Sequence, residues 1–312
     1  MKIAILDDYQ NVVKDLACFS LLNDFDVSIF TDTPASINEL AARLKSFDAL
    51  ILIRERTIIN SALLAQLPNL KVISQTGKIS NHIDVAACEK YGVKILEGIG
   101  SATAPAELCW ALIMAASRQI VRYANALQNN QWQQSGLGLG RTLSGLTLGI
   151  WGYGRIGQMV ARYAKAFDMN VLVWGSLSSR EKAIADGFLA ASTKEVFFSQ
   201  SDIVSLHERL NDSTKGIVSF ADLAHMKTDA LLVNISRAEL IEPNALEKSL
   251  KTGRPGFAAI DVFESEPVNT LDNPLLQMPN VLCTPHIGYV EKNSYELYFR
   301  AAFENIVNYS RA

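Results

Sequence analysis

The chain has 312 residues, of which 49% are hydrophobic and 20% are charged, and its formal net charge is −3 at pH 7. These values are ordinary for a globular protein, and a weakly acidic chain without blocks of like charge argues against a nucleic-acid surface. No apolar stretch is long enough to span a bilayer, so a membrane is not expected as a partner either. The sequence therefore predicts neither a membrane partner nor a nucleic-acid partner.

Strand and helix patterns alternate through the first hundred residues. Short apolar runs predict strands over 2–7, 26–30, 49–53, 71–74 and 93–96. Helical spacing predicts helices over 12–22, 36–45, 61–67 and 85–91, the second with Ser36 as its N-cap. This alternation is typical of a doubly wound α/β domain. Because no glycine-rich loop follows the first strand, this domain is not expected to hold a nucleotide.

A long helical pattern over 104–127 and a polar connector over 128–141 lead into a glycine-rich stretch. The stretch follows an apolar strand pattern and precedes a helical one, which is the context of a dinucleotide-binding turn. Gly152 permits the tight turn, Gly154 allows a pyrophosphate to approach, and Gly157 lets the helix pack on the sheet. The elements of this second α/β set are predicted as strands over 146–151, 170–174, 203–206, 230–234, 257–262 and 281–283, and helices over 158–167, 219–225, 243–252 and 291–309.

Three chemistry-bearing side chains follow strands of this second set. Arg237, Glu266 and His286 each come a few residues after a predicted strand. Ligands of open α/β sheets bind beyond the carboxyl ends of the strands. Taken singly, the arginine could pair with surface acids, the glutamate could sit in a solvated turn and the histidine could be an ordinary loop residue. Together they supply a cation for an anionic substrate, a base, and a carboxylate to orient the base.

The cysteines, the histidines and the N-terminus indicate the cellular compartment and whether a metal is expected. None of the four cysteines and four histidines has metal or redox spacing, so no metal is expected, and reduced thiols in a cytoplasm are the simplest interpretation. Asp7 and Asp8 come too early for a secretory signal. At this length we expect two domains, each with its own core.

The chain resembles the D-2-hydroxyacid dehydrogenases, which include D-lactate, D-glycerate and D-3-phosphoglycerate dehydrogenases. The resemblance rests on Gly-Tyr-Gly-Arg-Ile-Gly at 152–157, Leu-Val-Asn-Ile-Ser-Arg at 232–237, Asp-Val-Phe-Glu-Ser-Glu-Pro at 261–267 and Thr-Pro-His-Ile-Gly at 284–288, with weaker matches at 53–57 and 104–108. It implies hydride transfer between NAD(P)(H) and a 2-keto acid or D-2-hydroxy acid, and the predicted direction is reduction of the keto acid.

The resemblance also implies an architecture. A flavodoxin-like substrate domain would comprise residues 1–99 and 286–312, and a Rossmann dinucleotide-binding domain residues 100–285. The connector that carries Trp132 would contribute to a homodimer.

The same resemblance assigns roles to individual residues. His286 would exchange the proton, Glu266 would favour its charged form, and Arg237 would hold the keto oxygen and the carboxylate. Asp261 matches a position that binds the nicotinamide carboxamide. Four residues of the first domain would complete the substrate site: Arg54, Thr76, Gly77 and Lys78. The alternative interpretation of Lys78 is a solvated surface lysine.

The expected cofactor contacts depart from the family pattern at the end of the second strand of the nucleotide unit. Where an acid should end the second strand of the nucleotide unit, this chain has Gly175, so a 2′-phosphate would not be repelled. Ser176 and Arg180 follow as donors, which favours NADP while leaving NAD open. The remaining expected cofactor contacts are Arg155 and Ile156 in the turn, and His207 and Arg209 after the 203–206 strand.

Two other functions stay open from the sequence. The first is a nucleotide-sensing corepressor-like interaction protein on the same fold, which performs no turnover. The second is a dehydrogenase for another anion, such as formate or phosphonate. Retention of all three chemistry-bearing residues counts against the first, and fold alone does not decide the matter.

Overall fold

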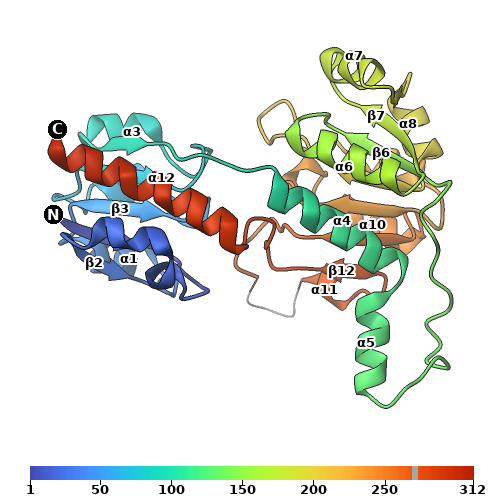
Figure 1. Ribbon diagram of the computed structural model, residues 1–312, viewed down its shortest axis with the longest axis horizontal. Helices are drawn as coiled ribbons and strands as arrows, with labels where there is room; N and C mark the ends of the chain where they lie inside the picture. The colour runs from blue at the N-terminus through green and yellow to red at the C-terminus, as the bar shows by residue number, and fades with distance from the viewer. Residues whose placement is uncertain (269–272) are drawn as a thin grey trace. The chain divides into compact units, whose positions relative to one another are not determined.

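The computed structural model describes residues 1–268 and 273–312 (Figure 1). These residues divide into two compact units: a first unit, Met1–Ser101 with Val290–Ala312, and a second unit, Ala102–Tyr289. Each unit is built around a parallel sheet, of five strands in the first and seven in the second. The predicted fold class of two doubly wound parallel-sheet domains is therefore confirmed.

The sheet of the first unit has the strand order β2-β1-β3-β4-β5, which is the flavodoxin-like order. Its strands are β1 (Lys2–Ile5), β2 (Asp26–Ile29), β3 (Ala49–Leu52), β4 (Val72–Gln75) and β5 (Lys94–Leu96). Side chains alternate between the two faces of each strand. One face packs against α1 (Ile37–Leu44), α2 (Ser61–Leu64) and α3 (Val85–Lys90).

The last helix of the chain, α12 (Lys292–Arg311), belongs to this first unit (Figure 1). It is held on β4 by a hydrogen bond from Ser74 Oγ to the carbonyl of Ala302, 2.9 Å long. Several of its apolar side chains are buried, among them Phe299 and Phe303. The helix therefore completes a core that begins almost 300 residues earlier in the chain.

One of the helix predictions for the first unit was wrong. In place of a single helix over 12–22, the chain forms two 3₁₀ helices, η1 (Val13–Asp15) and η2 (Ala17–Leu22). Leu16 between them is extended. The carboxylate of Glu296 in α12 accepts hydrogen bonds from the amides of Ala17 and Cys18 and so starts a new turn. A tertiary contact overrides the helical pattern here.

The sheet of the second unit has the order β12-β11-β10-β9-β6-β7-β8, the arrangement of a Rossmann domain with one further strand. Its strands are β6 (Thr147–Trp151), β7 (Asn170–Trp174), β8 (Leu189–Ala190), β9 (Ile203–Leu206), β10 (Leu231–Asn234), β11 (Phe257–Ile260) and β12 (Val281–Cys283). One face packs against α4 (Thr103–Ser117), α6 (Arg155–Ala166) and α7 (Leu177–Ala185). The other packs against α8 (Lys194–Gln200), α9 (Phe220–Ala224) and α10 (Ala245–Thr252).

The predicted helix over 104–127 is in fact two helices. It breaks after α4 at Gln119, which is left-handed with φ +52°, and resumes as α5 (Ile120–Gln128). The amide of Arg141 binds the carbonyl of Ser117, at 3.0 Å, as the chain returns to the sheet. This returning segment caps α4 and ends it.

Several short elements were not predicted from the sequence. They are α7, β8, α8, η3 (Ala238–Leu240) and α11 (Pro274–Gln277). In α7 the buried position is Ala183, so its apolar stripe is too narrow to be recognised. No helix of the described residues is long and apolar enough to cross a membrane.

Candidate active site

The turn from β6 into α6 is shaped by its glycines. Gly152 has φ +97°, and a Cβ there would lie 2.9 Å from the carbonyl oxygen of His207. A Cβ on Gly157 would collide with the carbonyl oxygen of Gly152. Gly154 is the N-cap of α6, offers no side-chain cap and faces open space. The turn therefore leaves the N-terminus of a 12-residue helix accessible, which fits a dinucleotide pyrophosphate.

Glu266 and His286 are brought into direct contact at one edge of the sheet. They follow β11 and β12, which are parallel neighbours. Glu266 Oε2 lies 2.6 Å from Nδ1 of His286, and Oε1 accepts a hydrogen bond of 2.8 Å from the amide of Phe263. Because the carboxylate can only accept, Nδ1 carries the proton of this bond. This orientation leaves Nε2 of His286 for another partner.

Asp261 holds the turn that carries His286. Its carboxylate accepts hydrogen bonds from Thr284 Oγ1 at 2.6 Å, the amide of Ile287 at 2.8 Å and the amide of Gly288 at 2.9 Å. Burial raises the pKa of this carboxyl, and the hydrogen bonds partly oppose that shift. His286 itself is left-handed, with φ +51°. The sequence had suggested only a contact with nicotinamide for this aspartate.

Replacing Asp261 by alanine is expected to leave these donors without acceptors. We expect the free energy of unfolding to fall by about 1–3 kcal/mol, the usual cost of unsatisfied buried polar groups. Turnover should fall as well, because the backbone around His286 loses its anchor. Thermal unfolding and kcat, measured beside the exposed control Asp212→Ala, check this, and parallel behaviour of the two variants would contradict it.

Arg237 follows β10, the next strand along the same sheet edge. Its half-buried side chain donates from Nη1 to the carbonyl of Ser236, at 2.6 Å. Asn234 shapes the turn, because its Oδ1 accepts from the amide of Ser236 and its Nδ2 donates to the carbonyl of Arg237. The three predicted chemistry-bearing residues thus follow three adjacent parallel strands.

Tyr289 packs against the histidine. The two rings lie edge to face, with centroids 5.7 Å apart, and the tyrosine is buried. This contact indicates that the tyrosine side chain fills the space beside the imidazole.

The predicted substrate contacts of the first unit lie on two adjoining loops. Thr76 Oγ1 accepts a hydrogen bond of 3.0 Å from the amide of Arg54. A Cβ on Gly77 would collide with Nη1 of Arg54, so the guanidinium lies directly against this glycine. Lys78 forms an exposed ion pair with Glu97, at 2.7 Å, which favours the interpretation of this lysine as a surface residue.

The predicted cofactor contacts lie at the ends of β6 and β7. Gly175 follows β7 with φ +146°. Ser176 is the N-cap of α7 and accepts a hydrogen bond from the amide of Ser179. The guanidinium of Arg180 lies 4.8 Å from the ring of Trp174. At the start of α6, Arg155 and Ile156 are exposed and half-buried, respectively.

The loop after β9 carries two further residues that were expected at the cofactor. Burial lowers the pKa of His207 to about 4, so its imidazole is neutral at ordinary pH. Its Nε2 lies 2.9 Å from Ser205 Oγ inside the unit. These contacts indicate a structural histidine. Arg209, two residues later, is exposed.

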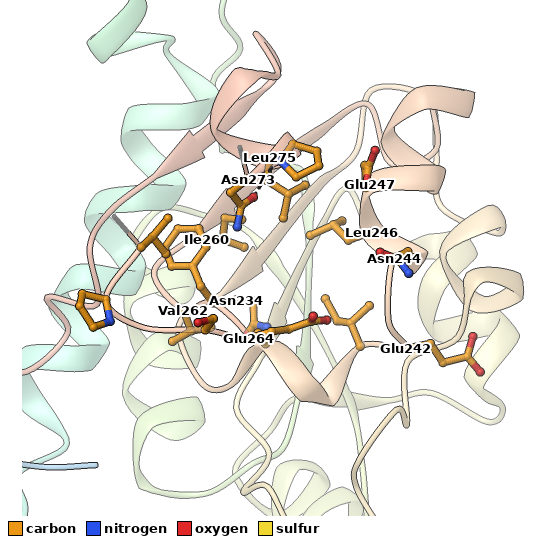
Figure 2. Close-up of a pocket in the computed structure, with 17 residues that line it drawn as sticks. Asn234, Glu242, Asn244, Leu246, Glu247, Ile260, Val262, Glu264, Asn273 and Leu275 are labelled. Atoms are coloured by element: carbon orange, nitrogen blue, oxygen red, sulfur yellow. Dashed lines mark hydrogen bonds between the residues drawn. The ribbon is translucent and has the colours of Figure 1, made fainter. Parts of the chain in front are cut away.

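A separate pocket of about 550 Å³ lies in the second unit (Figure 2). It is bordered by segments around β10, β11, α10 and α11, and none of the predicted site residues lines it. Glu242, Glu247 and Glu264 are among its lining residues (Figure 2). Three carboxylates would repel an anionic substrate, so the pocket does not fit a 2-keto acid. Among the described residues, no group of three or more side chains is arranged to hold a metal ion.

Comparison with known proteins gives a consistent result. The sequence model of the D-isomer-specific 2-hydroxyacid dehydrogenase NAD-binding domain matches residues 110–288. Glyoxylate reductase of Aeropyrum pernix is 33% identical over 92% of this chain and 87% of that protein. D-3-phosphoglycerate dehydrogenase of Methanocaldococcus jannaschii is 36% identical over 80% of the chain, and the match spans 47% of that longer protein. The crystal structure of a phosphoglycerate oxidoreductase from Vibrio cholerae O395 superposes with a TM-score of 0.97 and 59% identity, covering 100% of this chain and 99% of that one.

Proposed function

The chain belongs to the D-isomer-specific 2-hydroxyacid dehydrogenase family of NAD-dependent oxidoreductases, and from this we propose that it reduces a short 2-keto acid to a D-2-hydroxy acid. The contact between His286 and Glu266, beyond the strands of a dinucleotide-binding sheet, carries the proposal. The names of the reported relatives point to glyoxylate or a phosphorylated glycerate skeleton as substrates. These relatives give no support to the corepressor-like alternative.

The proposed mechanism assigns the proton to His286. A bound dinucleotide would supply the hydride, and negative charge would then develop on the substrate carbonyl oxygen. His286 donates a proton to that oxygen from Nε2, while Glu266 holds the ring through Nδ1 and stabilises the imidazolium. In the oxidative direction the same nitrogen accepts the proton.

Arg237 acts on the substrate in this proposal. Its guanidinium donates charge-assisted hydrogen bonds to the keto oxygen and the carboxylate, a planar geometry that lysine does not offer. The backbone at Thr76 and Gly77, together with Arg54, binds the substrate carboxylate from the first unit. Lys78, an exposed residue that is already paired with Glu97, takes no part in the proposed substrate site.

Gly77→Ala should disturb substrate binding with little effect on stability. The added methyl group displaces the guanidinium of Arg54, which is the flexible end of its side chain. We expect KM for the keto acid to rise by ~10-fold, about the value of one charge-assisted hydrogen bond. Gly100→Ala is the matched control, since a Cβ there meets nothing within 4 Å. Equal KM values for the two variants would remove Arg54 from the substrate site.

We also propose a homodimer formed through the segment after α5. Figure 1 shows α5 and this segment extending beyond the sheet of the second unit. Large apolar side chains are exposed on it, with Trp132 63% and Leu139 98% accessible. Tyr123 and Gln119 bind carbonyls of the returning chain and so hold its shape. Sedimentation equilibrium tests the dimer, and a monomer at micromolar concentration would refute it.

A cytoplasmic location is part of the same proposal. All four cysteines are free thiols. Burial raises the pKa of Cys109 to about 12 and that of Cys88 to about 11, so both thiols stay protonated. Unpaired, unreactive thiols suit a reducing compartment.

The proposed reaction is tested by following cofactor oxidation. NADH and NADPH are each offered with glyoxylate, hydroxypyruvate, pyruvate and a bulkier 2-keto acid. Turnover with any of these substrates supports the reaction class, and their relative kcat/KM values identify the substrate. Absence of turnover, despite dinucleotide binding observed by fluorescence, would favour the nucleotide-sensing alternative.

A further inference from the structure

The end of β7 lacks the acid that usually binds the adenosine ribose, yet a carboxylate lies beside it. A Cβ built on Gly175 would be 3.2 Å from Oε1 of Glu208. The space that an aspartate side chain would enter at this position is therefore already next to an acid. That acid comes from the loop after β9, which is separated from β7 in the sheet by β6.

The backbone that carries Glu208 is fixed on two sides. A Cβ on Gly152 would approach the carbonyl of His207 at 2.9 Å and the amide of Glu208 at 3.1 Å, so this loop lies against the glycine turn. On the other side, Ser236 Oγ donates to the carbonyl of Glu208 at 2.6 Å. The acid is thus held between the glycine turn and the end of β10.

The carboxylate of Glu208 has no protein partner within the described part of the chain. The residue is half-buried, and neither a hydrogen bond nor an ion pair to its side-chain oxygens occurs there. Burial raises the pKa of this carboxyl, which is the expected effect of desolvation without compensating donors. Two hydroxyl donors from a ligand would supply the missing hydrogen bonds.

We propose that Glu208 binds the adenosine ribose hydroxyls of the dinucleotide in place of the usual acid after β7, and that it makes this protein select NAD(H) over NADP(H). The inference rests on the proposed dehydrogenase function and names its cofactor. It reverses the preference for NADP that the sequence suggested. The carboxylate that is missing at Gly175 is supplied by Glu208, from the loop after β9. A 2′-phosphate at this position would meet the carboxylate at close range and be repelled.

Of the two donors that favoured NADP, Ser176 is already engaged. The hydroxyl of Ser176 caps α7, and it lies 3.0 Å from the Ser178 hydroxyl and 3.1 Å from the Ser179 hydroxyl. The guanidinium of Arg180 lies over the ring of Trp174, and its Nε has no hydrogen-bond partner among the described residues. Binding a 2′-phosphate through the hydroxyl of Ser176 would disturb that cap, whereas ribose hydroxyls at Glu208 need no such change.

Binding of cofactor fragments tests the inference without catalysis. Titration calorimetry would compare ADP-ribose with its 2′-phosphate on the unmodified protein, on Glu208→Gln and on the control Glu195→Gln. The control removes an exposed carboxylate of the same unit. We expect the unmodified protein and the control to prefer ADP-ribose by ~10-fold or more. In Glu208→Gln the Kd for ADP-ribose should rise ~10-fold and the preference should nearly vanish.

The outcomes separate this inference from the proposed function. Preference for the 2′-phosphate in the unmodified protein would overturn the assignment of Glu208, as would an unchanged ratio in a folded Glu208→Gln variant. The dehydrogenase proposal would survive either result. If neither fragment bound, both proposals would fail. Gly175→Asp is a weaker test, because φ +146° disfavours any side chain and the new carboxylate would meet Glu208.

Discussion

His286→Ala is expected to lower kcat by at least ~100-fold, the usual contribution of a positioned acid or base. The variant loses the group that would protonate the substrate oxygen, while the glycine turn that would hold the dinucleotide is untouched. Affinity for NADH should therefore stay close to that of the unmodified protein. Steady-state kinetics and a fluorescence titration with NADH check the two halves of this prediction.

The controls for this variant separate chemistry from stability. His225→Ala removes an exposed histidine of the same unit and should turn over normally. Glu266→Gln keeps a hydrogen-bond acceptor near Nδ1 but removes the charge that stabilises the imidazolium, so its kcat should lie between those of the unmodified protein and His286→Ala. Normal turnover by His286→Ala would remove the histidine from the mechanism.

The positions of the three chemistry-bearing residues at strand ends could be predicted because these positions depend on chain order alone. A strand that is buried on both faces has a continuous apolar pattern, and the residues directly after it must lie at the carboxyl edge of a parallel sheet. Arg237 and Glu266 come after such strands, β10 and β11, whereas His286 follows β12, a half-buried edge strand that is also apolar. Their order in the chain matches the order β10, β11 and β12 in the sheet.

Contacts across the fold could not be predicted in the same way. Glu208 approaches Gly175 from a loop more than 30 residues later, and nothing in the local pattern of either segment reveals the pairing. The same holds for Asp261, whose hydrogen bonds to the turn at 284–288 depend on strand register. The break in the helix at Gln119 could not be predicted for the same reason. The residue that caps α4 is Arg141, which lies 24 residues after Ser117 in the chain.

Arg237→Lys should raise KM for 2-keto acids by ~10- to 100-fold, the larger effect expected if both hydrogen bonds of the guanidinium are lost. Lysine keeps the positive charge but offers a single ammonium, so it does not reproduce two parallel hydrogen bonds. The substitution also removes the bond from Nη1 to the carbonyl of Ser236, which orients the side chain. Initial rates at saturating cofactor give KM and kcat separately.

The separate changes in KM and kcat show which groups of the substrate Arg237 contacts. If the arginine binds only the substrate carboxylate, KM rises and kcat changes little, because ground state and transition state lose equal binding. If it also contacts the keto oxygen, kcat falls as KM rises, since charge develops on that oxygen during hydride transfer. We expect the second pattern, and Arg162→Lys on the exposed face of α6 should show neither change. An unaltered KM in Arg237→Lys would indicate that another cation binds the substrate carboxylate. Arg54 is the candidate, because its guanidinium lies directly against Gly77.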